Sequence, residues 1–438
     1  MAQEQNEASI FDISLRRSAV ALVSLMVLAV LFVIGPTAKA QTFTVLHNFT
    51  NGTDGSYPRA GVTVSPSGVV YGTAEGGGTF GNGTVFKLSQ VNSTWVFSPL
   101  YEFAGGNDGS YPIGGVVIGP DGALYGTTQQ GGAENNGTVF ALRPPSTFCR
   151  SVVCYWNETI LHTFTGVPDG INPWVENLVF DAAGNIYGTT ANGGTYDNGT
   201  TFELTPSGGG YTESILHSFG HDQDGAYPEA GVVLDAAGNV YGATGAGGTG
   251  RGCSYGCGTA YQLTPSGGSW LENVLVNFDL GSASLAGAYY PYSPLIMDAS
   301  GNLYGTTIYS TSNFLDGIVF KLAPSGGGFA PSVFYAFLSS CQPYGGVTMD
   351  TAGNFFGVCL GSSSVFELTN CNPSCVLIDL HDFNGRDGSM PYGAPVLDAN
   401  GNLYGTTQYG GTSDNCQLGC GVVWEIAGVA APRKNRTE

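Results

Sequence analysis

The chain has 438 residues, of which 42% are hydrophobic and only 11% are charged. Its 33 acidic and 13 basic residues give a formal net charge of −20, so it would repel a polyanion, and nucleic-acid binding is not expected. Glycine is abundant, at 69 residues, but it does not recur at every third position, which excludes a collagen. It clusters between β-rich runs, a pattern typical of an all-β protein with many tight turns.

The N-terminal segment has the features of an export signal. Arg16 and Arg17 precede an apolar run over residues 18–34, and a small-residue triplet follows at 38–40. We therefore expect residues 1–40 to be a signal peptide, and the mature protein, without a membrane span, to be secreted, periplasmic or extracellular. The alternative is an uncleaved N-terminal membrane anchor, because the run reaches the lower limit of about 17 residues for a span.

A short phrase, an aromatic residue followed by glycine and usually by Thr-Thr, recurs along the rest of the chain. The first two copies, at Tyr71 and Tyr125, are 54 residues apart, and the other intervals are similar. Such a period belongs to architectures in which each repeat buries its faces against its neighbours. The aromatic residues of the seven copies are Tyr71, Tyr125, Tyr187, Tyr241, Tyr304, Phe356 and Tyr404.

One repeat unit, residues 229–278, predicts four short strands. Residues that tolerate left-handed backbone conformations separate the first two strands and the last two, and a glycine-rich loop joins the second to the third. Four antiparallel strands in a unit of this length form one blade of a β-propeller. The expected strands are 229–234, 239–244, 258–263 and 272–278, with turns at 235–239 and 264–268.

The two ends of the repeat region complement each other. Residues 43–49 match the fourth-strand phrases at 158–164 and 213–219, whereas no fourth strand follows residues 424–426. Pairing the N-terminal strand with the C-terminal blade would close the ring and leave no open edge. We therefore predict an all-β fold, a seven-bladed β-propeller of four-stranded blades over residues 41–426. A disordered tail at 427–438 and a monomeric state are also expected.

The repeated phrases resemble a known bacterial repeat. The segments 301–307, 317–322 and 137–142, with sequences such as GNLYGTT and GIVFKL, are similar to the GloVer repeat of the "choice-of-anchor tandem repeat GloVer-containing" proteins. The resemblance covers essentially all of residues 41–426. It implies an exported protein with no assigned activity, and it supplies no catalytic residues. Residues 427–438 depart from the pattern, because they contain neither an apolar anchor nor a recognisable sorting module.

Ten cysteines in an exported chain predict disulfide bonds. Two close pairs occupy equivalent places in enlarged loops of two repeats, two more close pairs lie in other connections, and the last two cysteines remain for each other. A zinc site is not expected from cysteines, because their spacing matches no compact four-cysteine unit. The expected pairs are Cys149–Cys154, Cys253–Cys257, Cys341–Cys359, Cys371–Cys375 and Cys416–Cys420.

One face of the propeller is the candidate ligand-binding surface. Loops between the fourth strand and the next first strand carry Asp-Gly, often followed by Tyr-Pro, and should share this face with the glycine-rich loops. Such residues could accept hydrogen bonds from sugars or stack on them, and no cofactor is expected except Ca²⁺ on the aspartates. The alternative is structural, since Asp-Gly also makes turns and tyrosine can pack between blades. The candidates are Asp54, Asp108, Asp169, Asp224, Asp387, Tyr57, Tyr111, Tyr227 and His221.

The histidines add little evidence of catalysis. His47, His162, His217 and His381 share one fourth-strand position, so a structural role is expected, and only His221 stands outside the repeat. No catalytic or metal motif is recognisable, and no catalytic or metal-ligating residue is assigned. Repeats five and six depart most from the pattern. Such departures reflect either a function added to the scaffold or sequence drift. We expect a non-catalytic binding scaffold for an extracellular glycan or protein, with a carbohydrate- or lactone-active lyase or hydrolase as the alternative.

Overall fold

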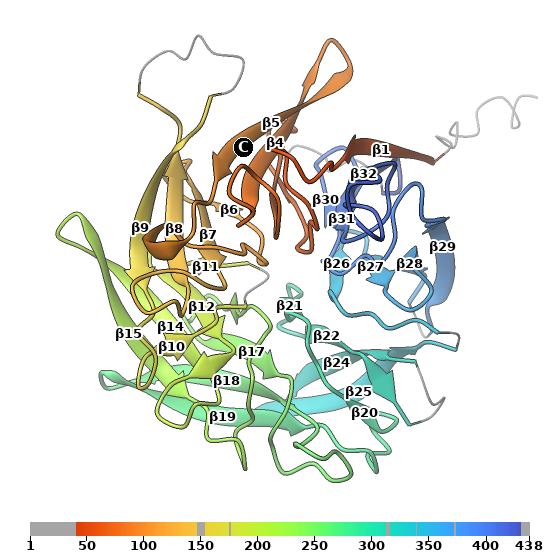
Figure 1. Cartoon of the computed structure of the whole chain (residues 1–438). Coiled ribbons are helices and arrows are strands. Elements are labelled where there is room, and N and C mark those ends of the chain that lie inside the picture. Colours follow the sequence, from red (N-terminus) through yellow and green to blue (C-terminus); the bar gives the residue numbers. More distant parts are fainter. Residues whose placement is uncertain are drawn as a thin grey trace, which may run out of the picture. The chain divides into compact units, whose positions relative to one another are not determined.

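The structure is a computed structural model that describes residues 41–146, 154–174, 177–311, 316–338, 340–371 and 374–430. The described residues form seven four-stranded antiparallel sheets arranged as blades around a ring (Figure 1), which confirms the predicted all-β seven-bladed propeller. The expected signal peptide and residues 431–438 of the expected tail lie outside these ranges. Among the described residues we find one 3₁₀ turn, η1 (Gly106–Asp108), and no helix of the length and apolarity needed to cross a membrane.

The blades are numbered in chain order, and each runs from the innermost strand to the outermost. Blade 1 consists of β2 (Thr63–Val64), β3 (Val70–Ala74), β4 (Thr84–Val91) and β5 (Thr94–Glu102). Blade 2 consists of β6 (Val117–Ile118), β7 (Leu124–Thr128), β8 (Thr138–Arg143) and β9 (Asn157–Thr163). Blade 3 consists of β11 (Val179–Phe180), β12 (Ile186–Thr190), β14 (Thr200–Ser207) and β15 (Gly210–Ser218). Blade 4 consists of β16 (Val233–Leu234), β17 (Val240–Thr244), β18 (Thr259–Ser266) and β19 (Ser269–Asn277). Blade 5 consists of β21 (Ile296–Met297), β22 (Leu303–Thr307), β24 (Ile318–Ser325) and β25 (Gly328–Ala336).

The last two blades complete the ring. Blade 6 consists of β26 (Val347–Met349), β27 (Phe355–Cys359), β28 (Ser364–Thr369) and β29 (Val376–Asp382). Blade 7 consists of β30 (Val396–Leu397), β31 (Leu403–Thr407), β32 (Val422–Ala427) and β1 (Thr42–Asn48). The N-terminal strand β1 pairs antiparallel with β32, from Thr42 opposite Ala427 to Asn48 opposite Val422. The predicted closure by the N-terminal strand is therefore confirmed.

The aromatic-glycine phrase is the second strand of each blade, and the glycine makes room for an aromatic ring. Gly72 on β3 lies opposite Phe86 on β4, and a Cβ atom on Gly72 would lie 2.5 Å from the Cζ atom of that ring. The same arrangement recurs in the other six blades. The pairs there are Gly126–Phe140, Gly188–Phe202, Gly242–Tyr261, Gly305–Phe320, Gly357–Phe366 and Gly405–Trp424. The glycine of the motif therefore makes room for a buried aromatic ring of the third strand, which lies across the second strand of the same blade.

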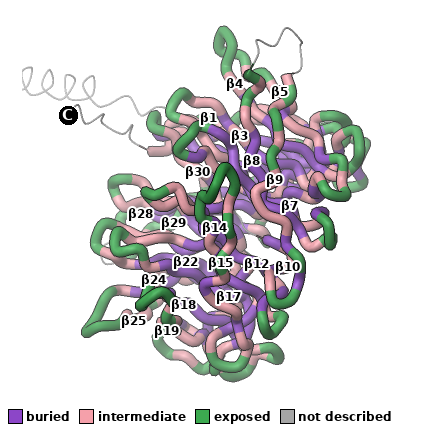
Figure 2. The backbone as a smooth tube through the Cα atoms, turned by 90° about the vertical axis from the view of Figure 1, so that its left-hand side faces the viewer, coloured by how far each residue is buried: buried purple, intermediate pink, exposed green. Residues whose placement is uncertain are grey.

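The hydrophobic core lies between neighbouring blades. For example, Val85 and Phe103 of blade 1 pack with Phe140 and Leu142 of blade 2, all fully buried. Figure 2 shows this distribution, with buried segments along the inner strands and exposed segments at the turns. Each blade thus buries its faces only against its two neighbours, as expected for a repeat fold.

The outer hairpins differ from the sequence-based expectation. The segment 264–268 was expected to be a turn, but β18 continues to Ser266, which pairs with Ser269 of β19. Only Gly267 and Gly268 form the turn, with φ angles of 59° and 88°. Two consecutive positive φ angles match a type I′ turn, whose twist suits a tight hairpin, so the strands extend further than the proline suggested.

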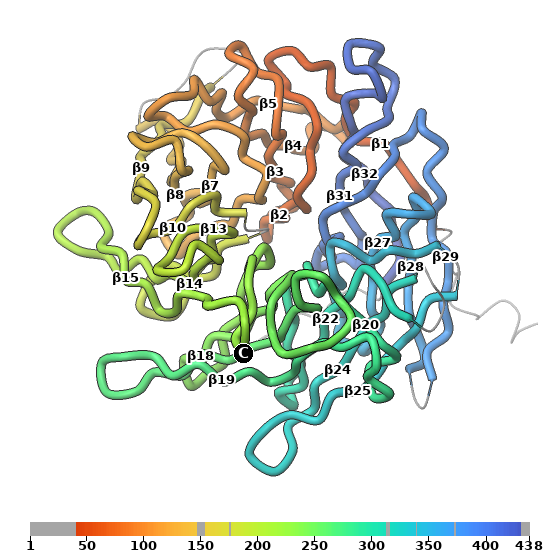
Figure 3. The backbone as a smooth tube through the Cα atoms, turned by 60° about the horizontal axis from the view of Figure 1, so that its bottom comes forward, coloured from red at the N-terminus to blue at the C-terminus, as the bar shows by residue number. Residues whose placement is uncertain are grey.

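Short bridges join two sets of loops on one face, as predicted. The small strand β10 (Gly170–Ile171) pairs with β13 (Asn192–Gly193), and β20 (Ala288–Tyr289) pairs with β23 (Tyr309–Ser310). Isolated bridges connect the equivalent loops in blades 1, 2, 4 and 7, for example Ser56 with Gly76. The Asp-Gly loops and the glycine-rich loops therefore lie together at one end of the blades (Figure 3).

Four of the five expected disulfide bonds are present among the described residues. They are Cys253–Cys257, Cys341–Cys359, Cys371–Cys375 and Cys416–Cys420. Cys149 lies outside the described residues, so its pairing with Cys154 stays a prediction.

Candidate functional site

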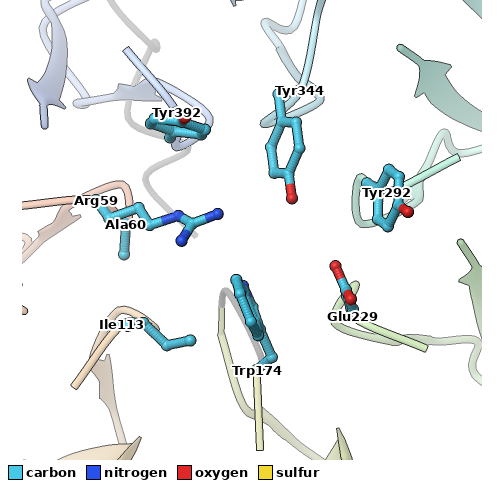
Figure 4. A pocket seen from close by; sticks show the side chains of 8 residues that line it. All are labelled: Arg59, Ala60, Ile113, Trp174, Glu229, Tyr292, Tyr344 and Tyr392. Atoms are coloured by element: carbon cyan, nitrogen blue, oxygen red, sulfur yellow. The ribbon is translucent and has the colours of Figure 1, made fainter. Parts of the chain in front are cut away.

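The ring axis opens on the face that carries the Asp-Gly loops, and one position of each repeat lines this opening. That position is the residue directly after the proline that ends each Asp-Gly loop or its equivalent. Figure 4 shows these side chains converging from different blades toward one centre. The proline is the same in every repeat, whereas the next residue is of five types, with tyrosine in the last three repeats. Ala60 also lines the space, and the seven residues at the repeated position, which we call the axial residues, are Arg59, Ile113, Trp174, Glu229, Tyr292, Tyr344 and Tyr392.

Arg59 of blade 1 is held between two aromatic rings. Its guanidinium carbon lies 4.8 Å from the centroid of the Trp174 ring and 4.7 Å from that of the Tyr392 ring. These distances are within the range of cation–π attraction, which is strengthened where water is partly excluded. The guanidinium group is therefore fixed in direction and points toward the axis (Figure 4).

Glu229 of blade 4 approaches the axis from the opposite side of the opening (Figure 4). Burial raises the pKa of this carboxyl to about 7, although the positive charge of Arg59 acts in the lowering direction. A carboxyl group with such a pKa can both donate and accept a proton near neutral pH. Arg59 and Glu229 thus supply polar groups of opposite character across the axis.

Three tyrosines cover the remaining arc of the opening. The rings of Tyr292 and Tyr344 are stacked, with centroids 5.6 Å apart and an interplanar angle of 7°, and Tyr392 meets Tyr344 edge to face. Burial raises the pKa of Tyr344 to about 12, so its hydroxyl is a neutral donor and acceptor at ordinary pH. The enclosed space between the axial residues is about 20 Å³. This is room for about one water molecule, so a larger ligand would rest on the mouth.

The aspartates expected to bind a ligand lie in separate loops, where local donors occupy their oxygens. Asp54 accepts hydrogen bonds from the Thr50 N–H at 2.9 Å and from His47 Nε2 at 3.1 Å. Asp224 pairs in the same way with His217 at 2.9 Å, and Asp387 with His381 at 3.1 Å. These contacts lower the pKa of Asp54 and Asp224, although burial opposes them. A ligand-binding role for these aspartates stays a prediction.

The candidate tyrosines make the connection between blades. Tyr57, Tyr111 and Tyr227 have positive φ angles of 59°, 56° and 56°. Each donates its backbone N–H to a carbonyl of the preceding blade, as Tyr57 does to Cys420 at 2.8 Å. His221 contacts Asp222 at 3.3 Å and is not among the axial residues. The structure therefore brings together the residues after the prolines rather than the candidates chosen from the loops.

A second feature of the repeat is a pair of carboxyl groups at the boundary between blades. Glu158 on β9 accepts a hydrogen bond at 3.1 Å from the Tyr101 hydroxyl of blade 1, which also contacts Asp108. One hydroxyl can donate only one such bond, and Glu158 Oε1 is buried without a partner. Burial, followed by the proximity of Asp108, raises the pKa of Glu158 to about 9. This group therefore favours the protonated state in the fold.

We expect Glu158→Gln to flatten the pH dependence of stability. The pKa of Glu158 is higher in the folded state than the 4.5 of the free side chain, so the folded state retains a proton that the unfolded state loses. Stability contributed by this group is complete below pH 4.5 and falls as the pH rises toward 9, by at most about 1.4 kcal/mol per pH unit.

Urea unfolding at pH 5, 7 and 9 measures this effect. Glu158→Gln should match the unaltered protein at pH 5 and become relatively more stable at each higher pH. Glu134→Gln is the control, because Glu134 is exposed in the neighbouring loop. If stability changes with pH in the same way for the Glu158 variant and the unaltered protein, the pKa of Glu158 is not raised in the folded state.

A family model described as the Gloeobacter/Verrucomicrobia repeat matches residues 29–156 and 153–365. The chain belongs to this repeat family. The resemblance inferred from the repeated phrases is thereby confirmed. No match was found among curated protein sequences.

Solved structures similar to this Gloeobacter/Verrucomicrobia repeat protein are also propellers. A streptogramin B lyase is 14% identical, with a TM-score of 0.53, over 89% of this chain and 99% of the lyase chain. A catalytically inactive virginiamycin B lyase variant from Staphylococcus aureus, solved with quinupristin, is 14% identical, with a TM-score of 0.53, over 88% and 99% of the two chains. At this level of identity the likeness shows the fold alone.

Proposed function

We propose that this repeat protein is a secreted, non-catalytic propeller that binds an extracellular glycan at its axial opening. The observation that most supports this is the variation of the axial residues within an otherwise regular repeat. A purely architectural position would be served by one residue type in every blade, as the glycine and proline positions are. Five residue types at seven equivalent positions around one opening, with the three tyrosines confined to one arc, are instead what a specific ligand requires.

The chemistry of the axial residues suits a sugar. Tyrosine and tryptophan rings offer apolar faces for the C–H groups of a pyranose. Arg59 can donate hydrogen bonds to sugar hydroxyl groups, and Glu229 can accept hydrogen bonds from them or, when protonated, donate one. Because the enclosed space is small, we expect the sugar ring to lie across the mouth, with only one hydroxyl group or a hydroxymethyl group entering between the side chains. The disulfide bonds and the expected signal peptide are consistent with exposure to extracellular glycans.

We expect Trp174→Ala to weaken glycan binding at least tenfold. The substitution removes an aromatic face and releases Arg59, which stacks on the same ring. The purified protein is first screened on a glycan array, and the affinity for the best ligand is then measured by calorimetry for both proteins. Trp270→Ala is the matched control, because Trp270 lies on β19 at the edge of the propeller.

Two results would contradict the proposal. One is an equal loss of affinity in the Trp270 variant, which would place the glycan elsewhere. The other is the absence of any glycan ligand together with tight binding of a defined extracellular protein, which would make the axial opening part of a protein-binding surface.

A second candidate function, a lyase or hydrolase acting on a carbohydrate or lactone, is favoured by one observation. The pKa of Glu229 is raised to about 7, which suits a general acid or base, and Arg59 lies across the same opening. Glu229→Gln separates the two functions. A binding protein would retain its glycan with little change in affinity, whereas an enzyme would bind substrate but lose turnover.

A further inference from the structure

The fourth-strand histidines form a series in which one member differs. His47, His217 and His381 each place Nε2 within 3.1 Å, 2.9 Å and 3.1 Å of an aspartate oxygen in the following loop, and each makes a hydrogen bond. In blade 2 the corresponding pair, His162 and Asp169, is separated by 3.5 Å, and His162 Nε2 has no hydrogen-bond partner.

A third group enters at this position from the next blade. Glu213 on β15 places Oε2 at 3.4 Å from His162 Nε2, and one ligand atom each of His162, Asp169 and Glu213 lie within 4.8 Å of one another. Among the described residues, this is the one set of three such side chains that converges so closely. The remaining Glu213 oxygen, Oε1, is also enclosed and without a hydrogen-bond partner. His162 Nε2 has only these two long contacts with carboxylates, and Glu213 Oε1 has no hydrogen bond, which is costly for enclosed polar atoms unless something binds them.

Two of the three separations, those from His162 Nε2, match the distances between ligands on a small metal ion. Zinc bonds to histidine nitrogen and carboxylate oxygen measure about 2.0–2.1 Å, so two ligands at a tetrahedral angle lie about 3.3–3.4 Å apart. The two distances from His162 Nε2, 3.5 Å and 3.4 Å, are close to this value and longer than the hydrogen bonds in the three other histidine pairs. Histidine with two carboxylates favours a divalent transition metal over Ca²⁺, which prefers oxygen ligands alone.

Neighbouring groups hold the Asp169 carboxylate and the His162 ring in place. Asp169 accepts hydrogen bonds from the backbone N–H and the hydroxyl of Thr165, at 2.8 Å and 3.0 Å, and from the Gly170 N–H at 2.6 Å. Such outer contacts orient ligating groups in metal sites. The His162 ring also packs edge to face on Phe164, with centroids 4.7 Å apart, so its direction is restricted.

We propose that His162, Asp169 and Glu213 bind one Zn²⁺ ion between blades 2 and 3. The ion takes three protein ligands and leaves a fourth position for water. Two ligands come from blade 2 and its following loop and one comes from β15 of blade 3, so the ion adds a link between two blades that are also joined by packing and by the hydrogen bond from the Asn172 N–H to the Asn136 carbonyl at 2.9 Å. This site lies on different residues from the axial opening, and its test does not depend on glycan binding.

The test measures Zn²⁺ binding to tag-free protein by competition with a chromophoric chelator. We expect one Zn²⁺ per chain, and His162→Asn and Glu213→Gln should each weaken binding at least tenfold. His217→Asn is the matched control, because His217 occupies the same position in blade 3 and packs on Phe219 with the same centroid distance of 4.7 Å. It should bind Zn²⁺ as the unaltered protein does.

Thermal unfolding provides an independent measurement. Zn²⁺ should raise the Tm of the unaltered protein and of His217→Asn but not of His162→Asn, and Ca²⁺ should raise none of them. Circular dichroism of the metal-free variants shows whether each is folded before Zn²⁺ is added, and Glu213→Gln replaces His162→Asn if that variant is unfolded. Absence of Zn²⁺ binding by the folded, unaltered protein would overturn the proposal, as would equal losses in the His162 and His217 variants.

Discussion

A chain that starts at Thr50, without β1, should lose cooperative unfolding or have a Tm at least 10 °C below that of a chain starting at Gln41. Removing β1 leaves β32 as an unpaired edge along its whole length and takes away Phe49, which is fully buried beside Phe86. It also removes Phe43, whose ring stacks on His381 of blade 6 at 3.5 Å. Loss of one large core side chain alone costs about 3–5 kcal/mol.

Adding the missing strand as a separate peptide distinguishes loss of closure from general damage. A synthetic peptide of residues 41–49 should raise the Tm of the shortened chain in a concentration-dependent way, because binding to the native state stabilises it by mass action. A scrambled peptide of the same composition is the control. If the shortened chain unfolds at the same temperature as the longer one, the ring does not depend on this pairing.

Gly188→Ala should destabilise the protein by about 1–3 kcal/mol, the usual cost of overpacking a core. The added Cβ would lie 2.6 Å from Cζ of Phe202 and 2.9 Å from Cδ2 of Leu178, both fully or almost fully buried. Urea unfolding measures the change in the free energy of unfolding. Gly210→Ala is the control, since its nearest neighbour would be an oxygen at 3.9 Å, and its stability should be unchanged or slightly higher.

Relieving the clash should restore part of the loss. In the double variant Gly188→Ala with Phe202→Leu, the smaller side chain leaves space for the new methyl group, so the combined cost should be well below the sum of the two single costs. Strict additivity would show that the glycine is required for another reason.

Much of the fold followed from residues that recur at a fixed interval. Phrases such as Gly301–Thr307 contain both the strand pattern and Gly305, which makes room for Phe320. The same combination recurs in every repeat, so it predicts the same local structure seven times. The outer hairpin was predicted less well, because a proline at 265 suggested a turn that two adjacent glycines provide two residues later.

The surroundings of the axial opening were predicted only in part, and the ligand-binding role expected of the loop residues stays a prediction. The loops were correctly placed on one face, yet their aspartates and tyrosines proved to make local and inter-blade hydrogen bonds. Variation after the shared proline, for example Arg59 in one repeat and Glu229 in another, was the signal in the sequence that could have identified the axial residues.

The sequence by itself determined the repeat, the seven blades, the closing strand and the four described disulfide bonds. The blades follow from recurring phrases, the closure from matching phrases at the two ends, and three of the disulfide bonds from cysteines four residues apart, which left Cys341 and Cys359 for each other. Only the tertiary structure decided which side chains meet at the axis and at the boundary between blades 2 and 3. Arg59, Glu229 and Tyr344 come from segments far apart in the sequence, and His162 meets Glu213 across the contact between adjacent blades. The packing of the blades decides which of these side chains come within contact distance, and the repeat pattern alone does not give those distances.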